Sequence, residues 1–418
     1  MEGWKIWLGA TDLFLSKMGN MDILIGDLLR GLGFWERSLV RPGNNVQDHL
    51  NEVQDLIGAN RWEHLYPRPT FRNGHYFRSL LTSMGLISLL KVPRLRSGTM
   101  RFKTLPRYLQ RSPDVDRGVL EMFLAGVSTR RIKEVLAPLM GCPTVSSSTV
   151  SRISKVLDHE VQRFHGSRLT DDYPYLILDG IYLKTNSPIH SKRRCILVAY
   201  GIRADGTREL IDFKMTRKGE SQVAWESFLV ALKHRGLDGN HLQLVVVDGN
   251  KGLWNAVDLV WLNVPRQRCW AHKLRNVANR IPKKLQPACM VEASDIYKAA
   301  SKVEATRAFR KWVQVWGGIV PGAVKCLEED FEDLIRFYDC PQTLWKKLRT
   351  TNIIERVFRE VRRRTRPISC FQNRESVERI IYAIFYRQNS LWKEKPLWKV
   401  ENGSQNLVLR PVKFVSHG

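Results

Sequence analysis

Two apolar segments of this sequence end in the same dipeptide. Residues 175–178 (Tyr-Leu-Ile-Leu) run into Asp179-Gly180, and residues 244–247 (Leu-Val-Val-Val) run into Asp248-Gly249. Short apolar runs that stop at an Asp-Gly pair are typical of strands buried on both faces. Such strands belong to α/β sheets, in which ligands bind beyond the carboxyl ends of the strands. The repeated pattern therefore predicts an α/β fold with an acidic residue at each of two strand ends.

The segments around these two strands predict a mixed sheet that is interrupted by helices. The turn at 204–207 contains Asp205-Gly206, which favours a hairpin and thus two antiparallel strands beside the first one. The further elements are, in order, a strand at 195–200, the hairpin turn at 204–207, a strand at 210–215, a helix at 221–235, a short strand at 264–269, an all-helical block at 283–345 and an arginine-rich helix from Ile353.

Asp179 and Asp248 converge if their two strands are neighbours. Two carboxylates that are brought together repel each other, so a hard divalent cation is the chemical reason to keep them there. Asp-Gly is also a common turn dipeptide, and both residues could serve only as turn formers. The residues alone leave these two interpretations open.

A third carboxylate, Glu355, is available on the arginine-rich helix. At 100° per residue, Arg359, Arg362 and Arg366 fall on the same stripe as Glu355. The opposite arc is apolar and would pack on the sheet. A metal ligand would then lie beside phosphate-binding groups. Two alternatives stay open: Asn352 to Glu355 has the spacing of a capping box, and Glu360, on another side of the helix, could be the ligand instead.

The charge of the chain points to a polyanionic partner. The 418 residues carry a formal net charge of +26, and residues 51–170 hold 19 basic against 9 acidic side chains. Lysines and arginines that neutralise phosphates gain affinity by releasing condensed counterions, so nucleic acid is the expected partner. The sequence contains no run of about 18 consecutive apolar residues, which is the length that a membrane-spanning helix needs.

Residues 115–165 show three helical patterns that fit a helix-turn-helix. Ser128 is expected to cap the second helix, and Ser146 or Ser147 the third. The last helix opens with small polar residues that suit entry into a DNA groove, and Ser148, Thr149 and Arg152 are the predicted contacts. A helical linker without DNA contacts is the alternative interpretation.

The segments before this helical region carry weaker patterns. Residues 1–66 read as a small helical domain, and residues 67–114 as a basic, strand-rich connector without a hydrophobic core of its own. Arg94 and Arg96 in this connector are expected to contact DNA. The seven scattered cysteines favour a reducing cytoplasm over a disulfide framework.

Cys269 and His272 have the spacing of half a zinc site. A closed structural zinc site needs four ligands, and no second pair with ligand spacing follows in the sequence. A packed cysteine and a hydrogen-bonded histidine are favoured, and no zinc is expected. The sequence has no phosphate loop of the Walker type, so no ATP dependence is expected either.

At this point the sequence resembles the Mutator-type transposases of bacterial insertion sequences, whose catalytic core is similar to ribonuclease H. The resemblance extends from about Phe71 to Trp392. The motifs that carry it are Arg72-Asn73-Gly74, Pro93-Arg94 with Arg96, Ser128-Thr129-Arg130, Asp179-Gly180, Arg235-Gly236-Leu237, Asp248-Gly249, Gln267-Arg268-Cys269 with His272 and Asn276, Thr350-Thr351-Asn352 with Glu355-Arg356, and Arg363-Arg364-Thr365.

The resemblance implies a catalytic triad of Asp179, Asp248 and Glu355 that binds two Mg²⁺ ions, with Mn²⁺ as a substitute. It also implies that Cys269 and His272 are architectural. The enzyme would cut and join DNA at the terminal inverted repeats of its element, as a homodimer assembled on element ends and target DNA in the bacterial nucleoid. Arg130, Arg359, Arg362, Arg363 and Arg366 would assist DNA binding. A structure-specific nuclease and a non-catalytic repressor derived from a transposase are the alternatives.

The expected fold class is thus α/β, a ribonuclease H-like mixed sheet preceded by N-terminal helical and helix-turn-helix domains and interrupted by an all-helical insertion. The expected domains are a helical domain at 1–66, the connector at 67–114, a helix-turn-helix domain at 115–168, the core at 169–282 and 346–402, the insertion at 283–345 and a tail at 403–418.

Overall fold

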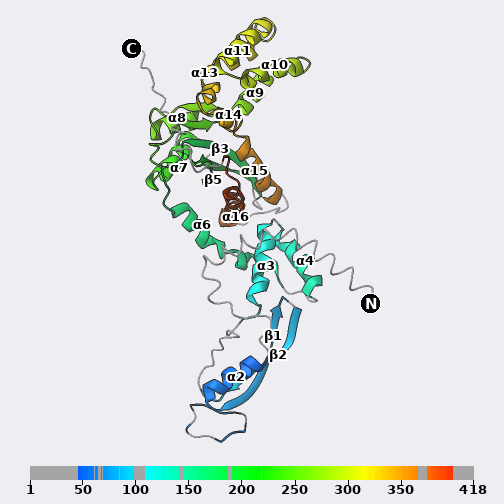
Figure 1. Ribbon diagram of the computed structural model, residues 1–418. Coiled ribbons are helices and arrows are strands. Elements are labelled where there is room, and N and C mark those ends of the chain that lie inside the picture. Colours follow the sequence, from blue (N-terminus) through cyan, green and yellow to red (C-terminus); the bar gives the residue numbers. More distant parts are fainter. Residues whose placement is uncertain are drawn as a thin grey trace. The chain divides into compact units, whose positions relative to one another are not determined.

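The computed structural model describes residues 46–60, 62–64, 67, 69–83, 85–97, 109–125, 127–140, 145–186, 191–217, 219–365 and 374–398. Most of the helical domain expected at 1–66, the tail expected at 403–418 and Arg366 lie outside these residues. The chain forms two compact units, Met1–Asp158 and His159–Gly418 (Figure 1).

The first unit begins with a helix that packs on a β-hairpin. Helix α2 (Val46–Ile57) lies beside strands β1 (Arg72–Thr82) and β2 (Gly85–Leu95), which pair antiparallel. Three residues from the helical side and three from the hairpin form a small buried cluster: Val53, Ile57, Ala59, Leu80, Leu90 and Val92. The expectation that this connector takes no part in a core is therefore wrong, because the buried Leu90 and Val92 alternate with Lys91 and Pro93 in β2.

The third helical pattern of the segment 115–165 is divided, because one helix ends at Ser154 and another begins at Leu157. Three helices therefore follow in the first unit. They are α3 (Pro113–Leu124), α4 (Thr129–Met140) and α5 (Ser147–Ser154). Ser128 accepts the Arg131 N–H at the start of α4, and Ser146 accepts the Thr149 N–H at the start of α5. Val119, Ile132 and Val150 are fully buried and come from the three different helices. The caps and the shared core explain why α5 begins where it does.

The second unit is built on a five-stranded mixed sheet, so the mixed α/β expectation is confirmed. The strand order is β5-β4-β3-β6-β7. The antiparallel part comprises β3 (Tyr175–Asn186), β4 (Ser191–Ile202) and β5 (Arg208–Thr216), and the parallel part comprises β3, β6 (Leu244–Val247) and β7 (Arg266–Arg268). Strand β3 differs from the expectation, since it does not end at Asp179 but continues to Asn186.

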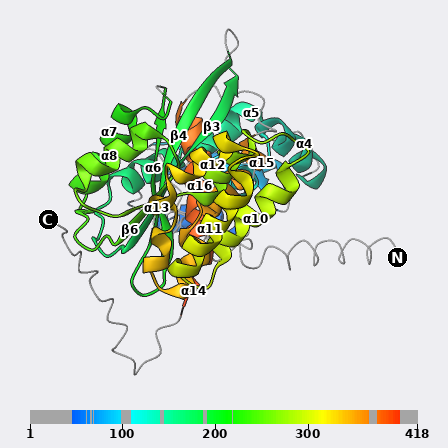
Figure 2. The same cartoon turned by 90° about the horizontal axis from the view of Figure 1, so that it is seen from above.

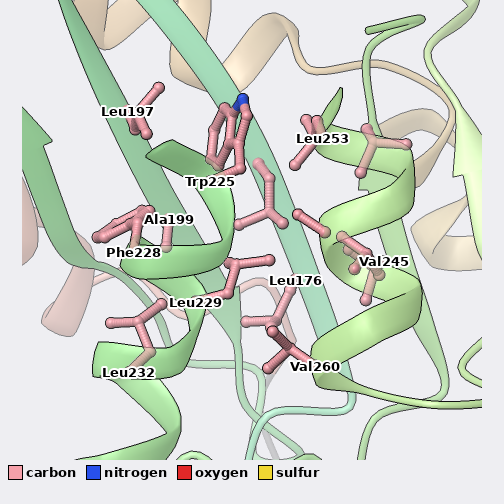
Figure 3. Close-up of a cluster of buried hydrophobic side chains, with 14 of the residues drawn as sticks. Leu176, Leu197, Ala199, Trp225, Phe228, Leu229, Leu232, Val245, Leu253 and Val260 are labelled. Atoms are coloured by element: carbon pink, nitrogen blue, oxygen red, sulfur yellow. The ribbon is translucent and has the colours of Figure 1, made fainter. Parts of the chain in front are cut away.

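Helices cover both faces of this sheet (Figure 2). On one face, α7 (Gln222–His234) and α8 (Lys251–Val260) pack their apolar side chains on β3, β4 and β6. Figure 3 shows this core, in which the fully buried Trp225 of α7 lies between the strands and Leu253 of α8. On the other face, α15 (Asn352–Thr365) contacts β3 and α16 (Arg374–Lys393) contacts β5. Both faces are thus apolar, as the uninterrupted hydrophobic strands predict.

Helix α6 (Leu157–Gly166) belongs mainly to the second unit. Its Phe164 contacts the rings of Phe213 on β5 and Tyr382 on α16. The division between the units at residue 158 therefore falls inside the segment expected as the helix-turn-helix domain at 115–168. The end of that segment packs on the sheet because its aromatic residue is part of the second unit's core.

The helical block beyond β7 is attached to the sheet through buried polar contacts. The Gln267 side chain donates to the Leu334 carbonyl at 2.9 Å and accepts the Phe337 N–H at 2.8 Å. Trp270 also donates to Leu334, at 2.6 Å. Figure 1 shows α9 to α11 grouped beyond the sheet. The helices of this part are α9 (Trp270–Ala278), α10 (Gln286–Lys298), α11 (Lys302–Trp316), α12 (Pro321–Glu328), α13 (Phe331–Leu334), the 3₁₀ helix η1 (Arg336–Asp339) and α14 (Gln342–Leu348).

Within the described part of the chain, every helix is too short or too polar to cross a membrane.

Candidate functional site

The parallel pairing of β3 with β6 brings two aspartates side by side. Ile177 is paired with Val246, so the register places Asp179 level with Asp248, two positions farther along both segments. Leu178 and Val247 point into the α7–α8 core, and alternation turns the side chain of Asp179 to the opposite face, on which α15 lies. Asp179 is 4% exposed, and Asp248 is half-buried. The predicted convergence of the two strands is therefore observed.

The environment of Asp179 strongly disfavours its charge. Burial raises the pKa of Asp179 to about 7, and the nearby charge of Asp248 acts in the same direction. His272 and a hydrogen bond from the Thr351 hydroxyl partly oppose this rise. A positive ion between the two carboxylates would favour their charged forms and so oppose both effects on the pKa of Asp179.

The turn-former interpretation applies to only one of the two aspartates. Asp179 lies inside β3, where it is paired with Val198 of β4. Asp248 does form a turn, since its Oδ1 atom accepts the Asn250 N–H at 2.9 Å. Asn250 then caps α8 by accepting the Gly252 N–H at 2.8 Å. Asp248 is thus tied to the start of α8 through one carboxylate oxygen, and no hydrogen bond to the second oxygen is formed among the described residues.

Glu355 faces α9 from the first turn of α15. Its Oε1 atom lies 3.9 Å from His272 Nε2 and 3.6 Å from Arg275 Nη2. Because the helix begins at Asn352, Glu355 is one position too late for a capping box whose first residue is Thr351. Glu355 therefore does not complete a capping box, and its carboxylate faces His272.

Glu360 has a different environment on the same helix. Its carboxylate pairs with Arg363 at 2.8 Å and with the buried Arg364 at 2.5 Å. Burial alone would raise the pKa of Glu360, but the hydrogen bonds and charges of these two arginines lower it. Arg363, which was expected to contact DNA, thus shares an intramolecular ion pair, and it is exposed, as Arg359 and Arg362 are.

Cys269 and His272 connect the elements that carry the three acids. Cys269 is fully buried, its N–H donates to the Val247 carbonyl at 2.8 Å, and its Sγ atom accepts the Thr351 N–H at 3.3 Å. The Nδ1 atom of His272 is buried and has no hydrogen-bond partner among the described residues. The pair therefore joins the end of β6 to the start of α15, close to Asp179 and Glu355.

Glu220 is an acidic residue of the site that the sequence patterns did not reveal. It immediately precedes Ser221, which caps α7, and Asn250 Nδ2 donates to its backbone oxygen at 3.1 Å and to its Oε2 atom at 3.4 Å. Burial and the charge of Asp248 raise the pKa of Glu220, while Asn250, Cys195 and His272 lower it. A Cβ atom at Gly180 would come within 2.5 Å of Glu220 Oε1. A side chain at position 180 would therefore displace the Glu220 carboxylate from its present position.

The two aspartates supply the oxygen ligands that Mg²⁺ prefers, with repulsion that a cation would relieve. Among the residues that the structure describes, no three Asp, Glu, His or Cys side chains are close enough together to hold one metal ion. Asp179 and Asp248 thus fit a divalent cation as a pair. Glu355 lies beside His272, whose charge also acts on Asp179.

The other predicted DNA contacts lie on the first unit. Ser148 and Arg152 on α5 are exposed, and Thr149 is half-buried. Arg130 on α4 is exposed as well. On the hairpin side, Arg94 lies over the ring of Tyr76 at 4.9 Å and Arg96 over that of Phe71 at 5.9 Å. These cations are accessible, as a role in phosphate binding requires.

Comparison with known proteins places the chain among transposases. The family model for "Transposase, Mutator family" matches residues 45–395. The chain is 34% identical to the transposase for insertion sequence element ISRM5 of Rhizobium meliloti, over 82% of this chain and 85% of that protein. It is also 34% identical to the transposase for IS256 in transposon Tn4001 of Staphylococcus aureus, over 82% and 87%. A third relative, the transposase for IS905 of Lactococcus lactis, is 30% identical over 81% and 85%. The protein therefore belongs to the Mutator family of transposases.

Proposed function

We propose that this protein is the transposase of an insertion sequence, which binds the ends of its element and catalyses divalent-metal-dependent cleavage and strand transfer of DNA. Its core would be of the ribonuclease H type, with Asp179, Asp248 and Glu355 as the acidic triad. The observation that carries this proposal is the parallel register of β3 and β6, which brings the buried Asp179 level with Asp248. Membership of the Mutator family supports the same reaction class.

Each acid has a distinct part in the proposed chemistry. Asp179 and Asp248 would hold Mg²⁺ or Mn²⁺, and Glu355 would complete the set from α15. When bound, such ions polarise the phosphoryl oxygen and lower the pKa of an attacking water or 3′-hydroxyl. His272, which lies near both Glu355 and Asp179, positions the two carboxylates relative to each other. The buried link between Cys269 and Thr351 keeps α15 against the sheet while DNA is bound.

Residues of both units would contact the DNA. Ser148, Thr149 and Arg152 on α5 would enter a groove of the terminal repeat, as the last helix of a helix-turn-helix does. Phosphate contacts would come from Arg94, Arg96 and Arg130 on the first unit and from Arg359, Arg362 and Arg366 on the second. Because two element ends must be joined to one target, a homodimer is the smallest assembly that performs the full reaction.

The proposal is tested with labelled element-end DNA, a plasmid target and Mg²⁺. Asp248→Asn removes one charge with little change of shape and should abolish cleavage and joining while DNA binding persists. Asp258→Asn is the matched control, since Asp258 also follows β6 but pairs with Arg266 at 2.6 Å, at the surface of α8. Wild-type turnover by Asp248→Asn would reject the acidic site, and cleavage without joining would identify a nuclease instead.

A further inference from the structure

A basic cavity of about 600 Å³ lies beside the acidic site, entirely within the second unit. Residues of β5, α9, α10, α14, α15 and α16 line it. Its walls carry six cationic side chains, which are Arg208, Lys346, Lys347, Arg349, Arg356 and Arg359. Such a volume is typical of pockets for small organic ligands and is too small for a DNA duplex.

The cavity and the acidic site share two helices. Ala271 of α9 lines the cavity, and the next residue, His272, contacts Glu355. Arg356 of α15 lines the cavity, and the residue before it is Glu355. On both helices, a residue that would contact a ligand in the cavity is therefore adjacent in the sequence to a residue of the acidic site.

Carboxylates of the described residues balance only part of the positive charge of the cavity. Among the described residues, Lys346, Lys347 and Arg356 make no ion pair with a carboxylate, and Glu360 on the wall is already paired with Arg363 and Arg364. Burial lowers the pKa of Lys347, and the neighbouring charges of Arg208, Arg356 and Lys346 lower it further. A bound anion would relieve this repulsion.

We call three aromatic residues of the lining, Trp270, Tyr297 and Trp392, the aromatic floor. The rings of Trp270 and Tyr297 are 5.1 Å apart, and Tyr297 is the most exposed of the three, since Trp270 is 1% and Trp392 8% exposed. Arg349 lies over the Tyr297 ring at 4.8 Å, and Arg208 lies over the Trp392 ring at 5.2 Å. Planar guanidinium groups and aromatic rings are the surfaces on which proteins stack unpaired bases.

We infer that this cavity binds one unpaired nucleotide of a DNA strand, with the base on the aromatic floor and the adjoining phosphates on Lys346, Lys347 and Arg356. The inference rests on the proposed function, because it makes the DNA substrate enter the protein next to the acids. A nucleotide that leaves the duplex here would fix the position of the neighbouring phosphodiester at the acidic site. The cavity then contributes to where the strand is cut, without contributing a catalytic group.

The test compares three duplexes of one sequence in EDTA, by fluorescence anisotropy with the full-length protein. The first contains a single extrahelical adenine, the second an abasic residue at that position, and the third is fully paired. The extrahelical adenine should bind at least about fivefold more tightly than the abasic residue, because stacking of one base is worth that much or more. Equal affinities for the adenine and the abasic duplex would overturn the inference.

Two variants locate the preference in the cavity. Gln388→Trp fills the cavity from α16 without removing charge and should abolish the difference between adenine and abasic DNA. Lys346→Ala with Lys347→Ala should weaken the adenine duplex more than the paired duplex. The matched control is Arg310→Ala with Lys311→Ala on α11, which is equal in charge and does not line the cavity. Equal effects of the two double variants would also overturn the inference.

This measurement is independent of cleavage. If Asp248→Asn turned over normally while the adenine preference persisted, only the proposed function would be wrong. If Asp248→Asn were inactive while adenine and abasic DNA bound equally well, only the cavity's role would be wrong. Thermal unfolding of Gln388→Trp shows whether that variant is folded, and the exposed Lys346 provides a test that does not depend on it.

Discussion

The Sγ atom of Cys269 lies 3.3 Å from the backbone nitrogen of Thr351, 82 positions later in the chain, and accepts its N–H. Cys269 also donates its own N–H to Val247, the last residue of β6. One buried residue therefore connects the strand that leads to Asp248 with the helix that carries Glu355. The helical block lies between these two positions in the sequence, and this contact brings the two ends of the block together at the site.

Cys269→Ala should loosen the start of α15. Loss of a buried hydrogen-bond acceptor and of packing predicts a destabilisation of about 1–3 kcal/mol. Hydrogen–deuterium exchange at the Thr351 amide should become faster. Cys289→Ala, another fully buried cysteine on α10, should lower stability without this local effect. Unchanged exchange at Thr351 in Cys269→Ala would contradict the role of the contact.

The metal-free protein should lose stability as the pH rises toward neutrality. The pKa of Asp179 is raised from 3.8 to about 7, so between these values the folded protein binds more protons than the unfolded chain. Its contribution to stability is complete below pH 3.8 and is lost as the pH passes 7. Asp179→Asn removes the effect and should stabilise the metal-free protein above this range by about 2–4 kcal/mol. Urea unfolding at several pH values measures the difference, and parallel curves for both proteins would refute it.

Glu220→Gln should change both the stability and the metal dependence of the protein. Removal of a carboxylate beside Asp248 should stabilise the metal-free protein and raise the Mg²⁺ concentration for half-maximal cleavage by about three- to tenfold. Glu226→Gln on α7 is the control, since Glu226 accepts a surface hydrogen bond from Gln222. An identical Mg²⁺ dependence in Glu220→Gln and wild type would exclude Glu220 from the site.

Glu355 and Glu360 should respond differently to the same substitution. Glu355→Gln should abolish cleavage while DNA binding persists, because Glu355 lies beside His272, whose charge also acts on Asp179. Glu360→Gln should leave cleavage measurable and lower stability by about 1–3 kcal/mol, because the buried Arg364 would lose the negative charge of this carboxylate. An active Glu355→Gln enzyme would show that the third acid has been assigned to the wrong residue.

Segments of this fold that carry a strong apolar pattern can be predicted from the sequence. The four residues of β6 are all buried, so their apolar run identifies the strand and its end at Asp248. The polar end of β3, from Lys184 to Asn186, could not be recognised, because it pairs with β4 beyond the core and carries no apolar signal. The hairpin core could not be recognised for a related reason, since only two buried residues, Leu90 and Val92, alternate with the basic and proline residues of β2.

The candidate site shows the same division. Asp179 and Asp248 follow from the ends of the two apolar runs, because parallel neighbours place equivalent positions together. Glu220 could not be found in this way, since it lies in a loop and approaches Asp248 only through tertiary packing against Gly180. The link between Cys269 and Thr351 depends on the helical block and has no local pattern either.

The most direct measurement is binding of Mn²⁺ to the DNA-bound protein, followed by electron paramagnetic resonance. Wild-type protein should bind Mn²⁺ at a site that Mg²⁺ competes for, and Asp179→Asn and Asp248→Asn should each weaken that binding by at least about tenfold, because carboxylates are the preferred ligands of these ions. Asp258→Asn should bind as the wild type does. Wild-type Mn²⁺ affinity in both Asp179→Asn and Asp248→Asn would contradict the account.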